Sequence, residues 1–406
     1  MSGYNFNVNQ QGKVMSKSKF FILIILISFL SAYVIDCHAQ QKNEKEEKNK
    51  KEEKRKKTFK DPEDGAFDIS YYMYNLHGFL PVPTLITEPA VGYGGALAGA
   101  FFIQKKNIDS VKFQMPDIVG IAGGYTQNQT WFTGAGYIGF WKQDRIRYRG
   151  VLGYADVKLK YYGEGEGFLS QHPVDFRIKS YVFLQQMTGR LGKSNFMLGG
   201  KYLLLMTTVT LFDNSDLEWL NPKDFNFTSS GVGLITEYES FDIILSPSKG
   251  WRIHADYVQN FEFLGSDRNY GILRFFTLWY QPVTRFWFSG LRIAGYVATG
   301  DPPFYMLPFV DMRGIPAMRY QGEITALAET EQHFNLTKRW SVLGFGGYGR
   351  TFFYSNDRKQ GSNSWSAGTG FRYLIARLLG LRMGIDVAKG PDDWAFYVVF
   401  GSAWLR

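Results

Sequence analysis

The chain has 406 residues, of which 45% are hydrophobic and 17% aromatic, and it carries a formal net charge of +9. Its mean hydropathy of −0.21 is too polar for a bundle of membrane helices, while 35 Phe, 25 Tyr and 10 Trp are far more aromatic residues than a disordered chain contains. The composition therefore excludes a polytopic helical membrane protein and a chain that is disordered along most of its length.

The first element along the chain is an apolar stretch at residues 20–35, which follows Lys17 and Lys19 and precedes the small residue Ala39. A basic start, an apolar centre and a small residue form the pattern of a secretory signal peptide, and the stretch is shorter than the roughly 20 residues of a spanning helix. We therefore predict a cleaved signal peptide at residues 1–39.

Two details of this signal bear on the mature chain. Translation is expected to start at Met15, and a short anchor helix is the alternative to cleavage. The single cysteine, Cys37, follows an aspartate and is a poor match to a lipoprotein acylation site. Cleavage after Ala39 would leave no cysteine, and hence no disulfide, thiolate metal site or cysteine nucleophile.

Residues 40–64 are predicted to form a charged, disordered tether. Between residues 41 and 60 there are ten Lys or Arg and five Glu, with Phe59 as the one apolar residue. Such a segment cannot bury a core, and attachment to an acidic surface is the alternative reading. Of the nine net charges, five lie in this stretch, two in residues 1–40 and two in residues 61–406. The basic balance therefore does not indicate nucleic-acid binding.

From about residue 79 onward the sequence alternates with period two, as β-strands do. Between residues 249 and 264 an apolar series that includes Trp251 and Tyr257 opposes a polar series that includes Arg252 and Asp256. Between residues 174 and 186 the apolar series is Phe176, Ile178, Val182 and Leu184, and the opposing series is Asp175, Arg177, Lys179 and Gln185. We interpret the apolar series as facing lipid and the polar series as lining a lumen, to which Arg252, Asp256, Glu262, Arg177 and Lys179 would contribute charges of both signs.

Turn-forming residues divide the chain into sixteen predicted strands, with fourteen as the alternative count. Their predicted bounds are 79–87, 90–104, 116–125, 129–141, 144–160, 173–188, 194–212, 228–240, 249–264, 268–281, 284–298, 319–333, 339–354, 363–377, 379–388 and 393–405. An even number of strands long enough to cross a bilayer predicts a closed antiparallel transmembrane β-barrel over residues 65–406.

A soluble β-sandwich or propeller would also alternate, so the period alone does not separate it from a barrel. Aromatic residues gather near the predicted strand ends, for example Trp279, Trp287 and Trp394, where a membrane barrel carries its interfacial girdles. Together with the export signal and the strand lengths, this pattern favours the barrel.

The segment between the eleventh and twelfth predicted strands is long and contains Met312-Arg313-Gly314-Ile315. This motif resembles the apolar-Arg-Gly-aromatic motif in the sixth extracellular loop of the BamA/TamA family of outer-membrane barrels, also called the bacterial surface antigen family. Five strands follow the loop here, as they do in that family. The resemblance implies that the loop folds back into the lumen, where inward polar side chains hold Arg313.

We expect Glu323, Glu329 or Glu331 of the twelfth strand to receive Arg313, because a carboxylate can pair with guanidinium through two hydrogen bonds. The family's usual partner is an aspartate of the thirteenth strand, but Phe345-Gly-Gly-Tyr-Gly stands there. Ile315 replaces the usual aromatic residue. An ordinary surface-loop arginine is the alternative reading.

Both ends of the predicted barrel also resemble the family. The end of the chain, which includes Phe396, Phe400, Gly401 and Trp404, resembles the C-terminal signal strand that assembly machinery reads. At the other end, Pro81, Pro83 and Pro89 lie in or beside the first strand, where a proline removes a ladder donor and weakens the seam between first and last strands. The family's periplasmic POTRA repeats do not fit between Gln40 and the first strand, so a barrel-only member is expected.

No catalytic, metal or cofactor site is evident. The five histidines, His38, His77, His172, His254 and His333, show no metal-ligand spacing, although His254 and His333 fall on the polar series. There is no G-x-S-x-G motif for a lipid hydrolase. We therefore expect a protein that is not an enzyme and needs no cofactor.

The resemblance implies a role in outer-membrane protein or envelope assembly or translocation in a Gram-negative bacterium. The expected partners are outer-membrane lipid, lipopolysaccharide and membrane or periplasmic assembly proteins, with no nucleic acid. A porin-like solute channel and a structural or surface-exposed antigen are the two alternatives. Single-channel conductance would separate a pore from a plugged barrel.

Overall fold

The structure is a computed structural model that describes residues 59–70, 79–103, 116–162, 171–211, 223–354 and 361–404. The predicted signal peptide and residues 40–58 of the predicted tether lie outside these ranges. Within them there is no helix long and apolar enough to cross a membrane.

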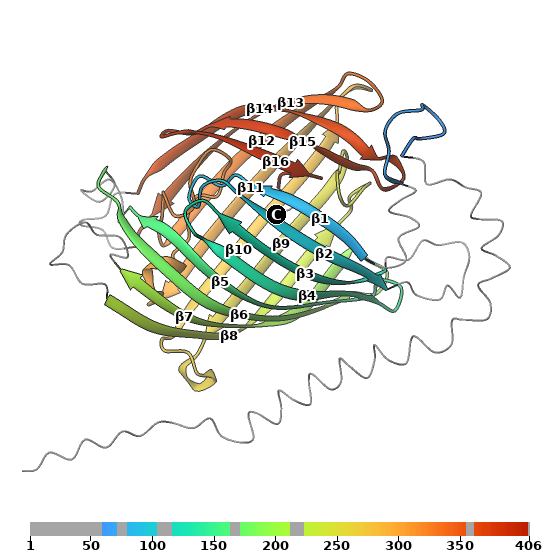
Figure 1. Ribbon diagram of the computed structural model, residues 1–406. Coiled ribbons are helices and arrows are strands. Elements are labelled where there is room, and N and C mark those ends of the chain that lie inside the picture. Colours follow the sequence, from blue (N-terminus) through green and yellow to red (C-terminus); the bar gives the residue numbers. More distant parts are fainter. Residues whose placement is uncertain are drawn as a thin grey trace, which may run out of the picture. The chain divides into compact units, whose positions relative to one another are not determined.

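Sixteen antiparallel strands follow one another in chain order around a nearly closed barrel (Figure 1). This is the fold that the sequence predicts. The strands are β1 (Phe79–Ile86), β2 (Gly94–Ile103), β3 (Asp117–Thr126), β4 (Trp131–Trp141), β5 (Ile146–Tyr161), β6 (Val174–Arg190), β7 (Phe196–Leu211), β8 (Lys223–Glu239), β9 (Gly250–Asn260), β10 (Tyr270–Pro282), β11 (Trp287–Gly300), β12 (Ile324–Asn335), β13 (Trp340–Phe352), β14 (Asn363–Ala376), β15 (Leu381–Lys389) and β16 (Trp394–Phe400).

Each of the sixteen predicted strands corresponds to one of these, and most bounds agree within a few residues. The eighth strand was predicted from residue 228 but β8 begins at Lys223, and the twelfth was predicted from residue 319 but β12 begins at Ile324. Two strands also end earlier than predicted. The ninth predicted strand ended at residue 264, but β9 ends at Asn260 and a short 3₁₀ helix follows at Glu262–Leu264. The last predicted strand ran to residue 405, but β16 ends at Phe400.

The outer face of the barrel is apolar around the whole ring. Large side chains such as Leu97, Ile121, Leu152, Leu234 and Trp340 are exposed on it. A soluble protein rarely exposes so continuous an apolar surface, whereas a transmembrane barrel requires one. This surface decides between the barrel and the soluble alternatives.

The inward face differs from the prediction at β6. Phe176 is buried and packs with Met318 of the β11–β12 loop, which lies in the lumen, whereas Tyr181 on the opposite parity is exposed. Arg177 and Lys179 share the parity of Tyr181, so they lie on the outer side, where Arg177 pairs with Asp156 at 2.6 Å. The prediction that they line the lumen is therefore wrong, because the inward face of this strand is apolar.

Glu262 does not line the lumen either, since it lies in the 3₁₀ helix after β9 and accepts a hydrogen bond from Asn269. For β9 the prediction is confirmed. Trp251 and Tyr257 are exposed on the outer face, and Asp256 is buried inside, where it pairs with Lys201.

The two ends of the barrel differ. Each odd-numbered strand leads to an end that carries the long β11–β12 segment, residues 301–323, which we call the loop end. The opposite end carries short turns, such as residues 142–145 and 336–339, together with the start of β1 and the end of β16; we call it the turn end. Bacterial barrels place long loops outside the cell and short turns in the periplasm.

Candidate functional site: an arginine-held loop beside an unpaired seam

The β11–β12 loop folds into the barrel, as the sequence predicts. Val310, Met312 and Ile315 are buried with Ala294 and Leu327 of the barrel wall. A loop that stays in water would expose these side chains, so their burial fixes the loop in the lumen.

Arg313 lies at the centre of the folded loop and is 2% exposed. Its guanidinium pairs with Glu331 of β12 at 2.5 Å and with Asp386 of β15 at 2.6 Å. The same group lies over the ring of Phe345 in β13, 3.5 Å from the ring centroid. We call these four residues the Arg313 cluster. Removing one partner from such a buried ion pair generally costs about 3–5 kcal/mol, so the cluster holds the loop firmly.

Gly314 allows the backbone to turn beside this cluster. Its φ is +83°, which favours glycine, and its amide donates a 2.9 Å hydrogen bond to the hydroxyl of Tyr397 in β16. A Cβ at this position would lie 3.0 Å from the backbone nitrogen of Gly390. The loop therefore contacts the last strands through its backbone as well as through Arg313.

One of the three predicted glutamate partners is confirmed. Glu331 receives Arg313, but Glu329 pairs instead with Arg292 of β11 at 2.6 Å. Glu323 lies at the loop end, where its carboxylate accepts the backbone amide of Tyr354 at 2.5 Å. The predictions for Glu323 and Glu329 are wrong because the first precedes β12 and the second has a nearer cation.

Sequence reasoning missed Asp386 and Phe345. Asp386 is fully buried and also accepts a 2.9 Å hydrogen bond from Arg372 of β14. In the sequence, Asp386 is an acid between Gly384 and Ala388 on the inward side of the strand, and this position is the signal that could have identified it. Phe345 of β13 presents its ring face to the guanidinium, which the negative face of an aromatic ring attracts.

The seam between β1 and β16 lies next to the held loop. Ladders of paired residues join every consecutive pair of strands from β1–β2 to β15–β16, but none joins β1 to β16 in the described part of the chain. Pro81 and Pro83 lie within β1, whereas Pro89 lies in the β1–β2 turn. Tyr93 stacks on Phe396 across the seam, with ring centroids 5.3 Å apart.

The C-terminal residues do not all belong to a strand. Phe396 and Phe400 face outward on β16, but Gly401 has a φ of +78° and redirects the chain. Trp404 is then buried against Tyr280 of β10, whose hydroxyl contacts Ser402 at 2.8 Å. Gly401 and Trp404 therefore form a short tail inside the turn end rather than the end of a signal strand, because the positive φ breaks the ladder.

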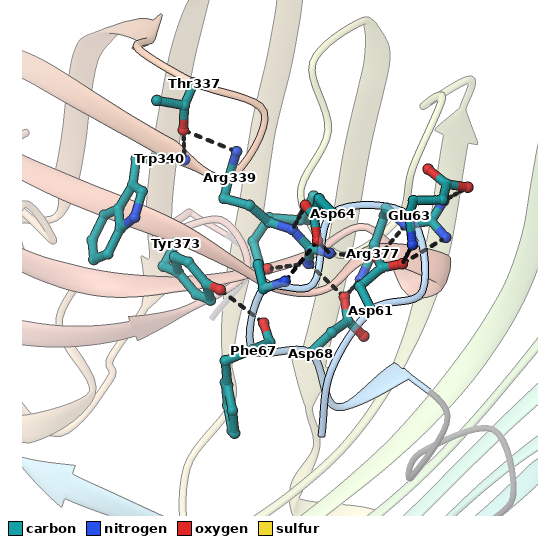
Figure 2. A network of polar contacts seen from close by, with 12 residues as sticks. Asp61, Glu63, Asp64, Phe67, Asp68, Thr337, Arg339, Trp340, Tyr373 and Arg377 are labelled. Atoms are coloured by element: carbon teal, nitrogen blue, oxygen red, sulfur yellow. Dashed lines mark hydrogen bonds and ion pairs between the residues drawn. The ribbon is translucent and has the colours of Figure 1, made fainter. Parts of the chain in front are cut away.

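Before β1, residues 59–70 form an N-terminal segment that lies against the β12–β13 and β14–β15 turns (Figure 2). Arg339 pairs with Asp61, with Asp64 at 2.6 Å and with Asp68 at 2.5 Å. The amide of Ile69 donates to the carbonyl of Ile375 at 2.8 Å. The sequence predicts a solvated tether up to residue 64, but Asp61 is only 3% exposed, because its carboxylate compensates Arg339.

The charges of this segment perturb its acids. The hydrogen bond from Arg377 is the main reason why the pKa of Asp61 is lowered to about 2. Hydrogen bonds from Arg339 lower the pKa of Asp64. Burial acts against this effect at Asp68, but hydrogen bonds from Arg339 and Ser70 still leave its pKa below the usual value. All three acids therefore stay ionised at neutral pH.

The lumen histidines serve as partners of carboxylates. His254 lies between Glu237 at 3.0 Å and Asp256 at 2.9 Å, and His333 contacts Glu331 at 2.8 Å. No group of His, Cys, Asp or Glu in the described ranges could hold a metal ion.

These features define a sixteen-stranded transmembrane β-barrel with an arginine-held inward loop. No protein-family model matches the sequence, and a search of curated proteins finds no match. Solved structures with the same fold include BamA from Haemophilus ducreyi lacking POTRA domains 1–3, at a TM-score of 0.54 and 12% identity over 80% of this chain and 70% of that one.

Two further similar structures are CdiB from Escherichia coli, at a TM-score of 0.55 and 11% identity, and CdiB from Acinetobacter baumannii, at 0.53 and 11%. Each match covers 80% of this chain, but only 62% and 59% of the respective CdiB chains. At such identities the likeness establishes the fold, and this chain corresponds to less than two thirds of either CdiB structure.

Proposed function

We propose that this chain is an outer-membrane barrel of a Gram-negative bacterium that acts, without catalysis, in the assembly or translocation of outer-membrane proteins or other envelope components. A cleaved signal peptide would export it. Its surroundings would be outer-membrane lipid and lipopolysaccharide, and its partners membrane or periplasmic assembly proteins.

The observation that carries this proposal is the unpaired seam beside a rigidly held loop. An exposed strand edge pairs readily with another strand, so β1 and β16 offer a template on which an incoming strand can form. The Arg313 cluster ties the loop to β12, β13 and β15. It therefore holds in place the strands that lead to β16, which forms one side of the seam. The likeness to the fold of BamA and CdiB agrees with this reading.

A seam disulfide tests the proposal. Tyr93→Cys with Phe396→Cys, whose rings stack on the outer face, would join the two sides of the seam. A matched control is Leu234→Cys with Tyr257→Cys, which are register partners on the outer face of β8 and β9. In the native host, oxidation of a seam pair should lower the amounts of other outer-membrane proteins, a reductant should restore them, and the control pair should have no effect.

Unchanged outer-membrane protein levels with a fully formed seam disulfide would refute an assembly role. Single-channel conductance in planar bilayers tests the alternative function, a porin-like solute channel. A porin-like channel would give a large, steady conductance step, and that result would replace assembly by solute transport as the best reading.

A further inference from the structure

The lumen has two chemically different walls. On β9–β15 the inward residues include many buried charges, such as Asp256, Arg292 and Arg372. On β2–β4 they carry no charge at all. Strand register places Ala98 of β2, Ala122 of β3 and Gly134 of β4 on this face, together with the residues two positions apart along each strand, which are Ala, Gly, Ile, Phe and one Thr.

The apolar wall extends to the strands on either side. Val82 and Ile86 of β1 pair with Ala98 and Gly94 of β2. On β5 and β6 the wall continues through register partners that include Val151 with Leu184 and Gly153 with Val182. We call the inward face of β1–β4, together with the part of β5 and β6 between Val151–Leu184 and the loop end, the apolar wall; nearer the turn end, β5 and β6 carry polar inward residues such as Arg147 and Gln186. These strands form one side of the barrel in Figure 1. Away from the charged residues near the loop end, such as Arg177 and Lys179, the outer face of these strands is also apolar, through residues such as Leu97, Ile121 and Leu152.

The apolar wall is partly exposed towards the lumen. Apart from the buried Thr126 at the loop end, its inward residues on β2, β3 and β4 fall between buried and exposed, unlike their buried counterparts on β12 and β15. Small residues stand side by side in register, for example Ala122 with Gly134 and Gly134 with Gly153. The result is a smooth apolar surface, which is unfavourable to leave in contact with water.

Where the loop reaches this wall, it covers the wall with apolar side chains. Phe304 and Met318 of the loop pack against Phe176 of β6 and Leu159 of β5, near the loop end. Closer to the turn end, Val151 and Leu184 remain partly exposed. The loop therefore shows that apolar groups pack against this wall. It covers the wall near the loop end only.

A cation lies at the turn end of the apolar wall. Arg149 follows the inward parity of β5, pairs in register with Ile138 and is exposed. It makes no hydrogen bond or ion pair with any residue that the structure describes. Its neighbour Arg147, in contrast, pairs with Asp144 at 2.7 Å, and the acid that acts on Arg149 electrostatically, Glu237, is held by His254.

The depth of Arg149 matches a membrane surface. On the outer face, Trp141 and Tyr148 stack with ring centroids 5.4 Å apart at the same turn end. Stacked aromatic residues of this kind mark the level of lipid headgroups. Arg149 thus lies inside the barrel at the depth where headgroups lie outside it.

We propose that the apolar wall binds a phospholipid with an anionic headgroup, with an acyl chain along the wall and the headgroup phosphate at Arg149. The chain would enter through the seam, because β1 is both the edge of the wall and the strand that no ladder joins to β16. A polypeptide would need partners for its backbone groups, which this wall does not offer, whereas an acyl chain needs none. The site does not depend on whether the barrel assembles proteins.

Photolabelling of the full chain in phosphatidylcholine vesicles tests the site. The probe is phosphatidylglycerol with a diazirine in one acyl chain, present as a small fraction of the lipid, and peptide mass spectrometry maps the adducts. Adducts on inward residues such as Ala98, Ala122 and Val151 are expected. Adducts confined to outward residues such as Leu97, Ile121 and Leu152 would overturn the proposal, and this result needs no variant.

Two substitutions with matched controls refine the test. Arg149→Gln should reduce inward labelling about tenfold, the effect of one lost charge-assisted hydrogen bond, whereas Arg145→Gln in the β4–β5 turn should not. Ala122→Asn should reduce inward labelling, whereas Ala135→Asn on the outer face should not. Equal inward labelling in Arg149→Gln and wild type would overturn the headgroup site.

A final arm distinguishes the occupants in cells. A photoreactive benzoylphenylalanine at Ala122 should yield a lipid-sized adduct. A polypeptide adduct at that position, whether from another protein or from this chain, would overturn the lipid proposal and assign the wall to a peptide.

Discussion

Replacing Arg313 by Ala should release the β11–β12 loop from the barrel. The substitution removes the ion pairs at 2.5 Å to Glu331 and at 2.6 Å to Asp386, which are 1% and 0% exposed. Two buried carboxylates then lose a shared cation, and the expected cost is about 3–5 kcal/mol. Since about 1.4 kcal/mol is a factor of ten, the population of the released loop should rise by about two to four orders of magnitude.

Two measurements follow this change. Trypsin can cut the loop at Arg319, whose pairing with Asp392 holds it in the folded loop, so the cleavage rate reports loop release. Urea unfolding in lipid vesicles, followed by tryptophan fluorescence, gives the cost in free energy. Arg313→Lys should have an intermediate effect of about 1.5–3 kcal/mol, because a single ammonium group cannot serve both carboxylates.

The control is Arg268→Ala. Its ion pair with Asp301 is exposed on both sides and should contribute less than about 1 kcal/mol. If Arg313→Ala unfolds at the same urea concentration as this control and its loop resists trypsin equally, the ion pairs do not hold the loop. Its apolar contacts, through residues such as Val310 and Ile315, would then be sufficient.

Three further outcomes can be measured. Replacing Arg339 by Leu should speed amide exchange at Ile69, whose hydrogen bond to Ile375 attaches the N-terminal segment. In the wild type this amide should stay protected above pH 4 and lose protection as the pH falls towards 2, because the attachment needs ionised acids and the pKa of Asp61 is lowered. Greater protection at low pH would contradict this. Gly314→Ala should destabilise the barrel more than Gly192→Ala, because both positions have positive φ but only Gly314 meets neighbouring backbone, so equal urea midpoints would show that the loop backbone adapts. Trp404→Ala should cost about 3–5 kcal/mol in urea unfolding, whereas Trp394→Ala, which is exposed on the outer face, should cost little, and equal costs would mean that the tail is not packed.

The strand order and number follow from the sequence because turn residues and period-two alternation are local signals. Which face of β6 points into the lumen does not follow from the sequence. Phe176, Ile178, Val182 and Leu184 form a clean apolar series, and such a series faces lipid only if the lumen is polar. Here the β11–β12 loop brings Phe304 and Met318 to that face, which no local pattern of β6 records.

The Arg313 cluster shows the same limit at the level of single residues. The loop motif identified Arg313, and the inward parity of β12 identified Glu331. Asp386 lies 73 residues away on β15, and only the curvature of the barrel brings it to the loop. Likewise Trp404 continues the alternation of β16 in sequence, but the left-handed conformation at Gly401 turns it inward.

The division of the lumen bears on the choice between assembly and solute transport. On β9–β15, charged side chains such as Glu329 and Arg372 are buried against one another and against the loop, so they compensate charge rather than line an open path. The remaining partly exposed wall, on β1–β6, is apolar and ends at the unpaired seam. Water-soluble solutes gain nothing from such a wall, whereas acyl chains do. A barrel whose open surface is apolar on the lumen side, and whose edge strand is free, is suited to exchange with the bilayer beside it rather than to passage along its axis.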